Sequence, residues 1–340
     1  MLRESGALQT CEVTVVSWEP IGTGQVGDSV RFHLVYSATA AEGPATLAAK
    51  FPAADETSRA TAAMLGLYGK EVHFYSELAP QLGVRTPRCH VADIDEQTGE
   101  FVLLFEDLGP ARGGNQLEGC GIEEARLGIM QAVALHAPSW RNEDILGRDW
   151  LHANADAAEK VRAMYPHAQS VFRERYAELL EPEFMQVCED LAACIPWLER
   201  DHPKLSLVHG DFRLDNMLFD IHGGDEPVAV LDWQTLSVGN GLTDVGYFMG
   251  CGIGDELRRA HELELLDLYH DEMNKAGVTL DRDEMWRDYV IGALHGVSTA
   301  VFSAAFVERT ERGDANFLSM ARGACALALE HDSLGMLERN

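Results

Sequence analysis

Three polar side chains follow two short apolar runs in the second half of the chain. The run LSLV at 205–208 leads into a His-Gly-Asp triplet that ends in Asp211, and Asn216 comes five residues later. A second run, VAVL at 228–231, ends directly at Asp232. Mg²⁺ prefers oxygen ligands and keeps several waters, so an asparagine, an aspartate and phosphate oxygens suffice to hold it. We therefore predict Asn216 and Asp232 as metal ligands and Asp211 as the group that accepts a proton from a hydroxyl.

A glycine-rich stretch near the start of the chain has the spacing of a phosphate-binding loop. IGTGQVGDS supplies Gly22, Gly24 and Gly27 as G-x-G-x-x-G between two expected strands. In a dinucleotide-binding fold the third glycine opens a helix, so this context argues against that fold. It favours a hairpin whose backbone amides cover phosphates, with an ordinary hairpin turn as the alternative.

Lys50 is the first lysine of the chain and ends the apolar run ATLAAKF. A lone amine at a strand end can hold nucleotide phosphates as a compact charge. The alternative is a surface lysine whose stem lies along apolar neighbours. Glu71 lies 21 residues later in the expected helix and is the favoured partner for Lys50. Glu77, nearer the end of that helix, is the second choice.

Two lobes are expected to position these groups. The first hundred residues alternate β-branched and aromatic strands with Gly-rich turns, interrupted by one helix from about 64 to 82. A Gly-dense stretch follows, and helical patterns then dominate. We predict an α+β fold with an N-terminal nucleotide-binding lobe at 1–106, a hinge and linker at 107–121, and a mainly helical catalytic and substrate-binding lobe at 122–340.

The motifs resemble those of a known superfamily. HGDFRLDN and VLDW are similar to the signature of the aminoglycoside phosphotransferase and choline-kinase-like proteins, which have a two-lobed protein-kinase-like fold. FRLDN, VAVLDWQ and LTDVGYF resemble kinase-like domains associated with acyl-CoA dehydrogenases. KEVHFYSEL and LLFEDLG resemble the ecdysteroid-kinase-like branch. The sequence does not separate these two branches.

The resemblance implies ATP and Mg²⁺ as cofactors and gives each motif a role. It makes Asp211 the catalytic base, Asn216 and Asp232 the magnesium ligands, Lys50 the phosphate clamp and Glu71 its partner. It places adenine against the hinge, at the carbonyl of Glu106 and the amide of Leu108. It also implies that Asp244 braces the loop that carries Asp211.

Arg213 follows Asp211 by two residues, where protein kinases often have a lysine that contacts phosphate. It is expected either to touch the transferred phosphoryl group or to pack as an ion pair. Asp232-Trp233-Gln234 stands in place of Asp-Phe-Gly, and no Ala-Pro-Glu follows. This leaves little room for an activation loop, which favours a small-molecule acceptor over a protein. No P-loop motif is present.

Composition narrows the class of partner. Acidic residues outnumber basic ones 55 to 27, for a formal charge of -28, which argues against an extended nucleic-acid or anionic-membrane surface. Seven scattered cysteines form no zinc-type cluster, and the N-terminus carries no apolar signal. We therefore expect free thiols in the cytoplasm. The oligomeric state stays open.

The expected activity is transfer of the γ-phosphoryl group of ATP to a hydroxyl of a small molecule. A nucleotide-binding pseudokinase that acts as an interaction module is the alternative, and a metal-dependent hydrolase is a third reading. An aminoglycoside-like, choline-like, steroid or hydroxyacyl acceptor, and ATP or GTP as donor, remain open. Glu308, Glu311 and Asp314 could line a pocket for a cationic acceptor, although a solvated helix end is favoured.

Overall fold

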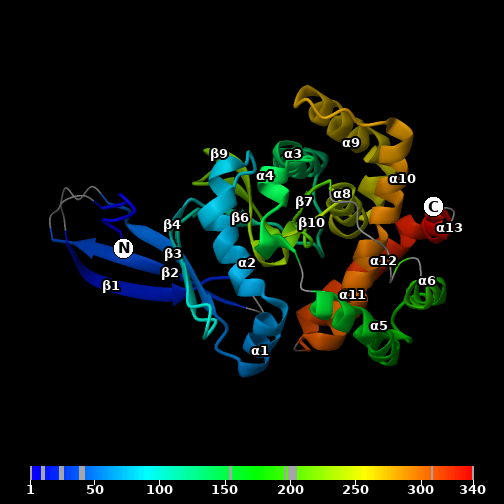
Figure 1. The fold of residues 1–340 in the computed structure, drawn as a ribbon, viewed down its shortest axis with the longest axis horizontal. Helices are drawn as coiled ribbons and strands as arrows, with labels where there is room; N and C mark the ends of the chain where they lie inside the picture. Colours follow the sequence, from blue (N-terminus) through cyan, green and yellow to red (C-terminus); the bar gives the residue numbers. More distant parts are fainter. Residues whose placement is uncertain are drawn as a thin grey trace. The chain divides into compact units, whose positions relative to one another are not determined.

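The chain forms two compact units in the computed structural model, which describes residues 2–8, 12–22, 27–37, 43–152, 155–194, 197, 205–307 and 309–338 (Figure 1). The sheet unit comprises Met1–Gln81, Arg85–Arg112 and Asp220–Thr235. The helical unit comprises Leu82–Val84, Gly113–Phe219 and Leu236–Asn340. The sequence-based division ran at 106 and 121, whereas the units assign 220–235, with Asp232, to the part that contains the N-terminal sheet. Each unit is described by itself below.

The sheet unit is built on five antiparallel strands in the order β1-β2-β3-β5-β4. Their bounds are β1 Val13–Pro20, β2 Gly27–Tyr36, β3 Thr46–Pro52, β4 Cys89–Ile94 and β5 Phe101–Glu106. Every second residue of β5 is buried, namely Phe101, Leu103 and Phe105, as expected for a strand with one face against a helix. Lys50 lies opposite Leu103 in the ladder, so its side chain stands on the same face as those three residues.

Two consecutive helices, α1 (Glu56–Leu65) and α2 (Leu67–His73), take the place of the single expected helix, and a π-helical turn at Phe74–Leu78 follows. The side chain of Asp55 caps α1 by accepting from the amide of Ser58. Gly66 then adopts a left-handed conformation, with φ 65°, which ends α1 and starts α2 at a new angle. In α2, Tyr68 packs on Phe101 with ring centroids 4.6 Å apart, so α2 covers the Lys50 face of the sheet.

Three further short strands pair with one another. Strands β6 (Arg112–Gly113), β8 (Met217–Ile221) and β9 (Glu226–Val230) form a three-stranded sheet in the order β6-β8-β9. β8 follows Asn216 directly, and β9 ends two residues before Asp232.

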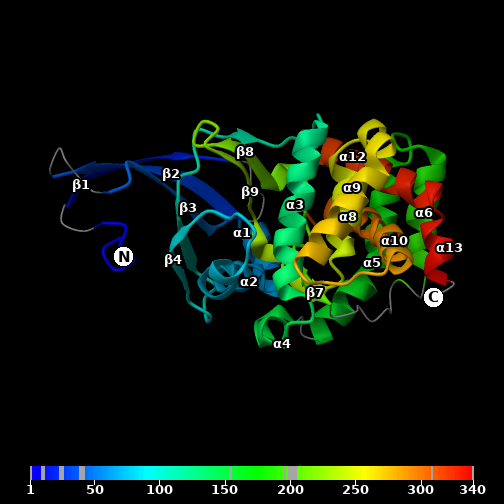
Figure 2. The same cartoon turned by 90° about the horizontal axis from the view of Figure 1, so that it is seen from above.

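The helical unit contains the remaining elements. They are α3 Ile122–Ser139, α4 Glu143–Leu146, α5 Ala155–Tyr176, α6 Pro182–Ala193, β7 Ser206–Val208, β10 Ser237–Gly239, α8 Leu242–Tyr247, α9 Asp255–Lys275, α10 Arg282–Gly292, α11 Leu294–Phe306, α12 Glu311–Glu330 and α13 Ser333–Glu338. Helices α5, α6, α11 and α12 share the main apolar core of this unit. Helices α3 and α9 lie side by side (Figure 2).

One helical run is apolar enough to cross a membrane by length and composition. It covers Arg282–Phe306, and 56% of its most apolar window is buried inside the protein. α10 and α11 share this run, and their inward faces carry Tyr289, Val297 and Val301, all fully buried. A mostly buried run of this kind is what a core helix shows.

Six cysteines in the described part of the chain are free thiols.

Candidate active site

The residues that follow β7 form a loop, 209–216, that carries Asp211 and Asn216 and is called the Asp211 loop here. β7 pairs antiparallel with β10, with Val208 opposite Ser237. At Gly210 the backbone takes φ 82°, a conformation that strains any residue with a side chain. The glycine therefore lets the chain turn sharply from the buried strand into the loop.

Asp244 braces the start of this loop, as its family role implied. Its carboxylate is fully buried and accepts hydrogen bonds from the amides of His209 (2.7 Å) and Gly210 (2.9 Å). His136, also fully buried, lies 3.2 Å from the same carboxylate. Burial alone would raise the pKa of Asp244, but the contacts with His136 and His209 outweigh it and lower that pKa. Two backbone amides and the contact with His136 thus hold the loop against α8 and α3.

Two hydrogen-bond donors and one ion-pair partner surround the carboxylate of Asp211. Oδ1 accepts from the hydroxyl of Tyr247 at 2.8 Å and lies 2.8 Å from Nε of Arg213. Oδ2 accepts from the side-chain amide of Asn216 at 2.8 Å. Burial opposes ionisation of Asp211, but the charge of Arg213 and the hydrogen bond from Tyr247 lower its pKa below the ordinary value. The carboxylate is thereby kept ionised and pointed in one direction.

Asn216 is oriented by its own amide nitrogen. That nitrogen donates both to the carboxylate and to the backbone carbonyl of Asp211, each at 2.8 Å. The amide oxygen has no partner among the residues that the structure describes. Because the nitrogen is committed to Asp211, the oxygen is the atom presented outward, and an outward amide oxygen fits a Mg²⁺ ligand.

In the sheet unit, Lys50 meets Glu71 and Asp232. Its ammonium lies 2.7 Å from Glu71 Oε2 and 2.8 Å from Asp232 Oδ1. Burial would lower the pKa of Lys50, but the two carboxylates outweigh it and raise that pKa. Burial raises the pKa of Glu71, whose side chain is only 2% exposed. The favoured partner, Glu71, thus pairs with Lys50, whereas Glu77 contacts His73.

Asp232 sits in a backbone conformation that non-glycine residues rarely adopt, with φ 64°. Trp233 anchors it: this fully buried ring stacks on Phe74 with centroids 3.9 Å apart and planes at 10°. Such strain persists only where the surroundings impose it, and it gathers at functional sites. Oδ2 of Asp232 accepts only a long bond, 3.4 Å, from Gln234, so this oxygen also fits a metal ligand.

The glycine-rich stretch lies against Lys50 at its far end. At Gly27, the first residue of β2, a Cβ would lie 3.0 Å from Cε of Lys50 and 3.1 Å from the carbonyl of Phe51. The absent side chain thus leaves room for the lysine stem. Gly22 has φ 75°, and Gly24 lies outside the described residues. The expected hairpin context holds, because β1 and β2 flank the stretch.

The two expected hinge positions lie at the end of β5. Glu106 closes the strand, and its carboxylate accepts from Arg85 at 2.6 Å and from the amide of Arg88 at 2.7 Å. Leu108 is 4% exposed, and its carbonyl accepts from the amide of His222. Its own amide donates to no acceptor in the described ranges. A buried amide without an acceptor suits a ligand that supplies one.

Comparison with known proteins decides the family. The model of the ecdysteroid kinase-like family matches residues 27–281, three quarters of the chain. The chain belongs to the ecdysteroid kinase-like family. The branch named from KEVHFYSEL and LLFEDLG is therefore confirmed.

Similar proteins agree on the fold of this ecdysteroid kinase-like chain. A microcompartment-associated aminopropanol kinase superposes with a TM-score of 0.50 at 15% identity, over 98% of this chain and 99% of its own. Aminoglycoside 2'-phosphotransferase-IIIa, solved with GDP, gives a TM-score of 0.51 at 13% identity over 93% of each chain. At these identities the likeness shows the fold alone, and it confirms the predicted two-lobed kinase-like class.

The curated relatives match only a short segment. Acyl-CoA dehydrogenase family member 10 from Mus musculus is 45% identical over 56 residues, which is 16% of this chain and 5% of the mouse protein. The matched part thus spans a small fraction of the relatives' length. The relative's name, acyl-CoA dehydrogenase family member, agrees with the second resemblance stated from the sequence.

The structure brings the expected site residues of this family member together in two sets. Lys50, Glu71 and Asp232 meet in the sheet unit, and Asp211, Arg213 and Asn216 meet in the helical unit. No three His, Cys, Asp or Glu side chains within the described ranges are grouped as a metal site. The two predicted magnesium ligands, one asparagine and one aspartate, are outside what such a grouping of three side chains describes.

Sequence reasoning missed several residues beside Asp211. Tyr247 was part of the LTDVGYF motif, but nothing in that motif marked its hydroxyl as a partner of Asp211. His295, on α11, lies 2.7 Å from the carbonyl of Gly210 and packs edge-on against the ring of Tyr247. Asp215 lies within HGDFRLDN, and Arg312 contacts it from α12 at 3.2 Å. Contacts across 36 to 97 positions of chain leave no local sequence signal.

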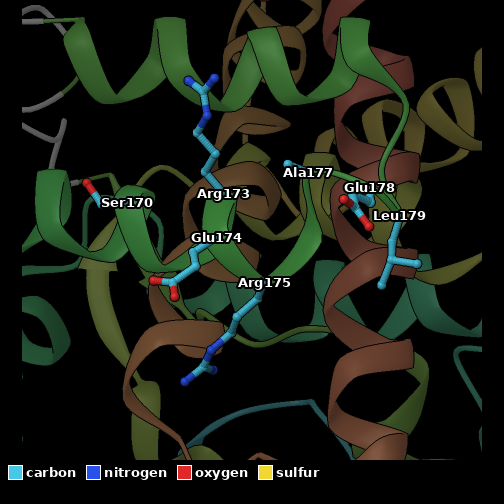
Figure 3. A pocket seen from close by; sticks show the side chains of 7 residues that line it. All are labelled: Ser170, Arg173, Glu174, Arg175, Ala177, Glu178 and Leu179. Carbon is cyan, nitrogen blue, oxygen red and sulfur yellow. The ribbon is translucent and has the colours of Figure 1, made fainter.

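A separate pocket lies at the C-terminal end of α5 and contains none of the expected residues. It has a volume of about 600 Å³ and is lined mainly by charged side chains (Figure 3). The lining residues are Ser170, Arg173, Glu174, Arg175, Ala177, Glu178 and Leu179.

Nearby, Asp314 accepts from the hydroxyl of Tyr176 at 2.6 Å and pairs with Arg309 at 2.8 Å. Its negative charge is therefore already paired. Glu311 is exposed in the first turn of α12, and Glu308 lies outside the described residues.

Proposed function

We propose that this protein is a kinase that transfers the γ-phosphoryl group of ATP to a hydroxyl of a small molecule. Its family and fold are those of small-molecule kinases, while the donor nucleotide, the metal and the acceptor belong to this proposal. The observation that carries it is the environment of Asp211. A carboxylate held ionised and oriented by two hydrogen bonds and an ion pair is what a proton acceptor needs, whereas a module that only binds nucleotide has no use for it.

The proposed reaction balances in one step. The hydroxyl oxygen of the acceptor forms a bond to the γ-phosphorus, and the bond from that phosphorus to the bridging oxygen of ADP breaks. The hydroxyl proton passes to Asp211, which releases it to solvent after the product leaves. Because the transition state of phosphoryl transfer is loose, positioning and charge neutralisation supply most of the acceleration.

The remaining residues bind and orient. Lys50, whose direction is set by Glu71, would hold phosphate oxygens of the nucleotide. The amide of Leu108 and the carbonyl of Glu106 would receive the base. Asn216 and Asp232 each have an oxygen suited to Mg²⁺, which when bound neutralises phosphate charge. Arg213 has its Nε against Asp211, so it is an ion-pair partner first, and its outer nitrogens could still reach a phosphoryl group.

Replacing the charged oxygens tests the proposal. Asp211→Asn and Asp232→Asn keep the shape of each side chain, and asparagine tolerates the positive φ at 232. We expect each variant to lower Mg²⁺-dependent, acceptor-stimulated ATP turnover by at least ~10²-fold with the fold intact, as for the loss of a positioned base or electrostatic group. Asp267→Asn, at an exposed carboxylate of α9, is the control and should change nothing.

Two results would contradict the proposal. ATP binding without turnover, across a broad panel of hydroxylated metabolites, would favour the interaction module. Metal-dependent hydrolysis by a protein with no affinity for nucleotides would favour the hydrolase.

A further inference from the structure

Next to the proposed base, one carboxylate joins two arginines from different elements. Asp215, in the Asp211 loop, lies 3.4 Å from Nη1 of Arg213 and 3.2 and 3.3 Å from Nη2 of Arg312. It also accepts from the side-chain amide of Asn316 at 3.0 Å and from the backbone amide of Gln116 at 2.9 Å. Arg312 and Asn316 belong to α12. These five residues, the Asp215 cluster, all lie in the helical unit.

The Asp215 cluster holds more donors than its own acceptors use. Nη2 of Arg213, and Nε and Nη1 of Arg312, have no partner in the described part of the chain. Gln116 is only 3% exposed, and its side-chain nitrogen Nε2 is buried without a hydrogen-bond partner in the described part of the chain. A buried N–H without an acceptor is costly. A clamp that only fixed α12 to the loop would not need this buried amide.

The charges of the cluster favour an anion. Arg213 and Arg312 carry two positive charges against one on Asp215. Asp211 brings the total to zero, and its charge is neutralised when it accepts the hydroxyl proton. In a chain of formal charge -28, two guanidinium groups on one carboxylate gather positive charge locally, and this can attract a negative group against the overall field. Glu311, next to Arg312 on α12, is exposed and carries the nearest further negative charge along the chain.

We propose that the phosphoryl acceptor carries an anionic group, a carboxylate or a phosphate, that binds to Arg213, Arg312 and Gln116. This inference rests on the proposed function, since it assigns the acceptor of that same reaction. Guanidinium groups bind both kinds of oxyanion through paired hydrogen bonds. Oδ1 of Asn316, buried and unpartnered, can accept from a second hydroxyl of the same molecule.

Arg213 also limits the size of that acceptor. Its Nε contacts Asp211 at 2.8 Å while the outer side of the same guanidinium carries the unused Nη2. One planar group thus touches both the proton acceptor and the proposed anion. The reacting hydroxyl and the anionic group must therefore be only a few bonds apart, as they are in a small hydroxy acid or a polyol phosphate.

Matched acceptors provide the first test. Turnover of MgATP is measured with glycerate and glycerol 3-phosphate, with the neutral counterparts glyceramide and glycerol, and with cationic ethanolamine. We expect kcat/KM at least ~10-fold higher for the anionic compounds, as for a charge-assisted pair of hydrogen bonds. Comparing kcat/KM for glycerate with kcat/KM for glycerol 3-phosphate shows whether the site prefers a carboxylate or a phosphate. Equal or better use of the neutral or cationic compounds would overturn the inference while leaving the kinase proposal standing.

Variants assign the effect to the cluster. Arg312→Gln should raise KM for the anionic acceptor by ~10-fold, because one pair of charged hydrogen bonds is lost, and should leave KM for ATP unchanged. Arg309→Gln is the matched control: it removes an exposed arginine that pairs with Asp314, and it should alter neither constant. A rise in KM for ATP alone with Arg312→Gln would assign the arginines to the nucleotide phosphates and overturn the inference.

A binding arm keeps the two proposals separable. Calorimetry with glycerate and glycerol 3-phosphate, without nucleotide, should show binding to the unmodified protein that weakens in Arg312→Gln. If no acceptor is turned over but this binding is found, the kinase proposal fails and the anion site stands. If neither compound binds at ~10 mM, which corresponds to a binding free energy weaker than about -3 kcal/mol, the anion site fails. Thermal unfolding of both variants checks that they are folded.

Discussion

At the scale of single residues, both sets of polar groups depend on neighbours that decide their charge. Asp211 is partly buried, yet Arg213 and Tyr247 keep its pKa low. Lys50 is largely buried between two carboxylates that raise its pKa. In each case burial opposes the charged form and a specific partner outweighs burial. Removing a partner should therefore change protonation before it changes shape.

Tyr247→Phe tests this for Asp211. The variant loses the hydroxyl that donates to Asp211 Oδ1 at 2.8 Å, so the pKa of Asp211 should rise. Activity that needs ionised Asp211 is lost as pH falls through that pKa. The acid limb of the profile of kcat/KM against pH should therefore move to higher pH in the variant.

The same change has a consequence for stability. A depressed carboxyl pKa stabilises the folded state above the unfolded pKa of about 3.9, and this contribution is lost as pH falls through the folded pKa. Tyr247→Phe should reduce it. Tyr176→Phe is the matched control, because it also removes a tyrosine–aspartate hydrogen bond, to Asp314, but away from the Asp211 loop. If the acid limb of the profile of kcat/KM against pH is the same in Tyr247→Phe and Tyr176→Phe, Tyr247 does not set the pKa of Asp211.

Lys50→Met should destabilise the fold as well as impair nucleotide binding. The substitution leaves Glu71, 2% exposed, without its cation, and breaking a buried pair from one side costs about 3–5 kcal/mol. Adding Glu71→Gln should recover part of that loss, because the uncompensated charge is gone. Lys70→Met, at a lysine of α2 without an ion pair among the described residues, is the control. Urea denaturation gives the free energies of unfolding, and a double variant no better than Lys50→Met would contradict the argument.

At the scale of elements, close approach of backbones places the segments that support the Asp211 loop. The helical segment that begins with α8 continues through a π-helical turn at Phe248–Gly252. α12 crosses this turn where Gly323 meets Gly250, and a Cβ on Gly323 would lie 2.0 Å from the carbonyl oxygen of Gly250. Because α8 carries Tyr247 and α12 carries Arg312, this crossing sets the distance between the elements that supply both side chains.

Gly323→Ala should therefore destabilise the helical unit. No flexible side chain can yield at this contact, so α12 must shift, and overpacking of this kind costs about 1–3 kcal/mol. Gly69→Ala in α2 is the opposite case, because a Cβ there meets nothing within 4 Å and alanine is the better helix former by ~1 kcal/mol. Thermal unfolding of both variants checks the prediction, which fails if Gly323→Ala is as well tolerated as Gly69→Ala.

At the scale of the whole molecule, the kinase-like fold determines where a nucleotide and a base are expected, but it does not choose the acceptor. Fold and function are separable, because the same architecture carries sites of different chemistry. The choice lies in the helical unit, where the Asp215 cluster joins the Asp211 loop to α12. The strongly acidic composition acts on solubility and long-range attraction of charged ligands, not on this local choice.

Binding of MgATP should stabilise the whole chain. A ligand that binds only the folded state adds about 2.7 kcal/mol at 100 times its dissociation constant. We expect the midpoint of thermal unfolding to rise with MgATP in the unmodified protein and to rise far less in Lys50→Met. Magnesium alone is the control. An equal rise in both proteins would show that Lys50 does not contact the nucleotide.

The sequence by itself indicated the superfamily, the fold class and most of the polar residues that form each set. HGD-x4-N, the strand that ends at Lys50 and the aspartate after VAVL are local patterns, since strand ends and turns are set by neighbouring residues. That is why Lys50 with Glu71, and Asp211 with Asn216, were predictable. The division of the helix expected at 64–82 into α1 and α2 was not predictable. It results from the left-handed turn at Gly66, which depends on how α2 packs on β5.

Only the tertiary structure decided which further residues surround the base. Tyr247, His295 and Arg312 reach the Asp211 loop from 36 to 97 positions away, and their contacts arise from helix crossings that no local period encodes. The same holds for the assignment of 220–235 to the sheet unit, which depends on the pairing of distant strands and on the stacking of Trp233 upon Phe74. The reactive groups of one loop can be recognised from consecutive residues. The pKa values and charges around them are set by residues that are distant in sequence and that only folding brings near.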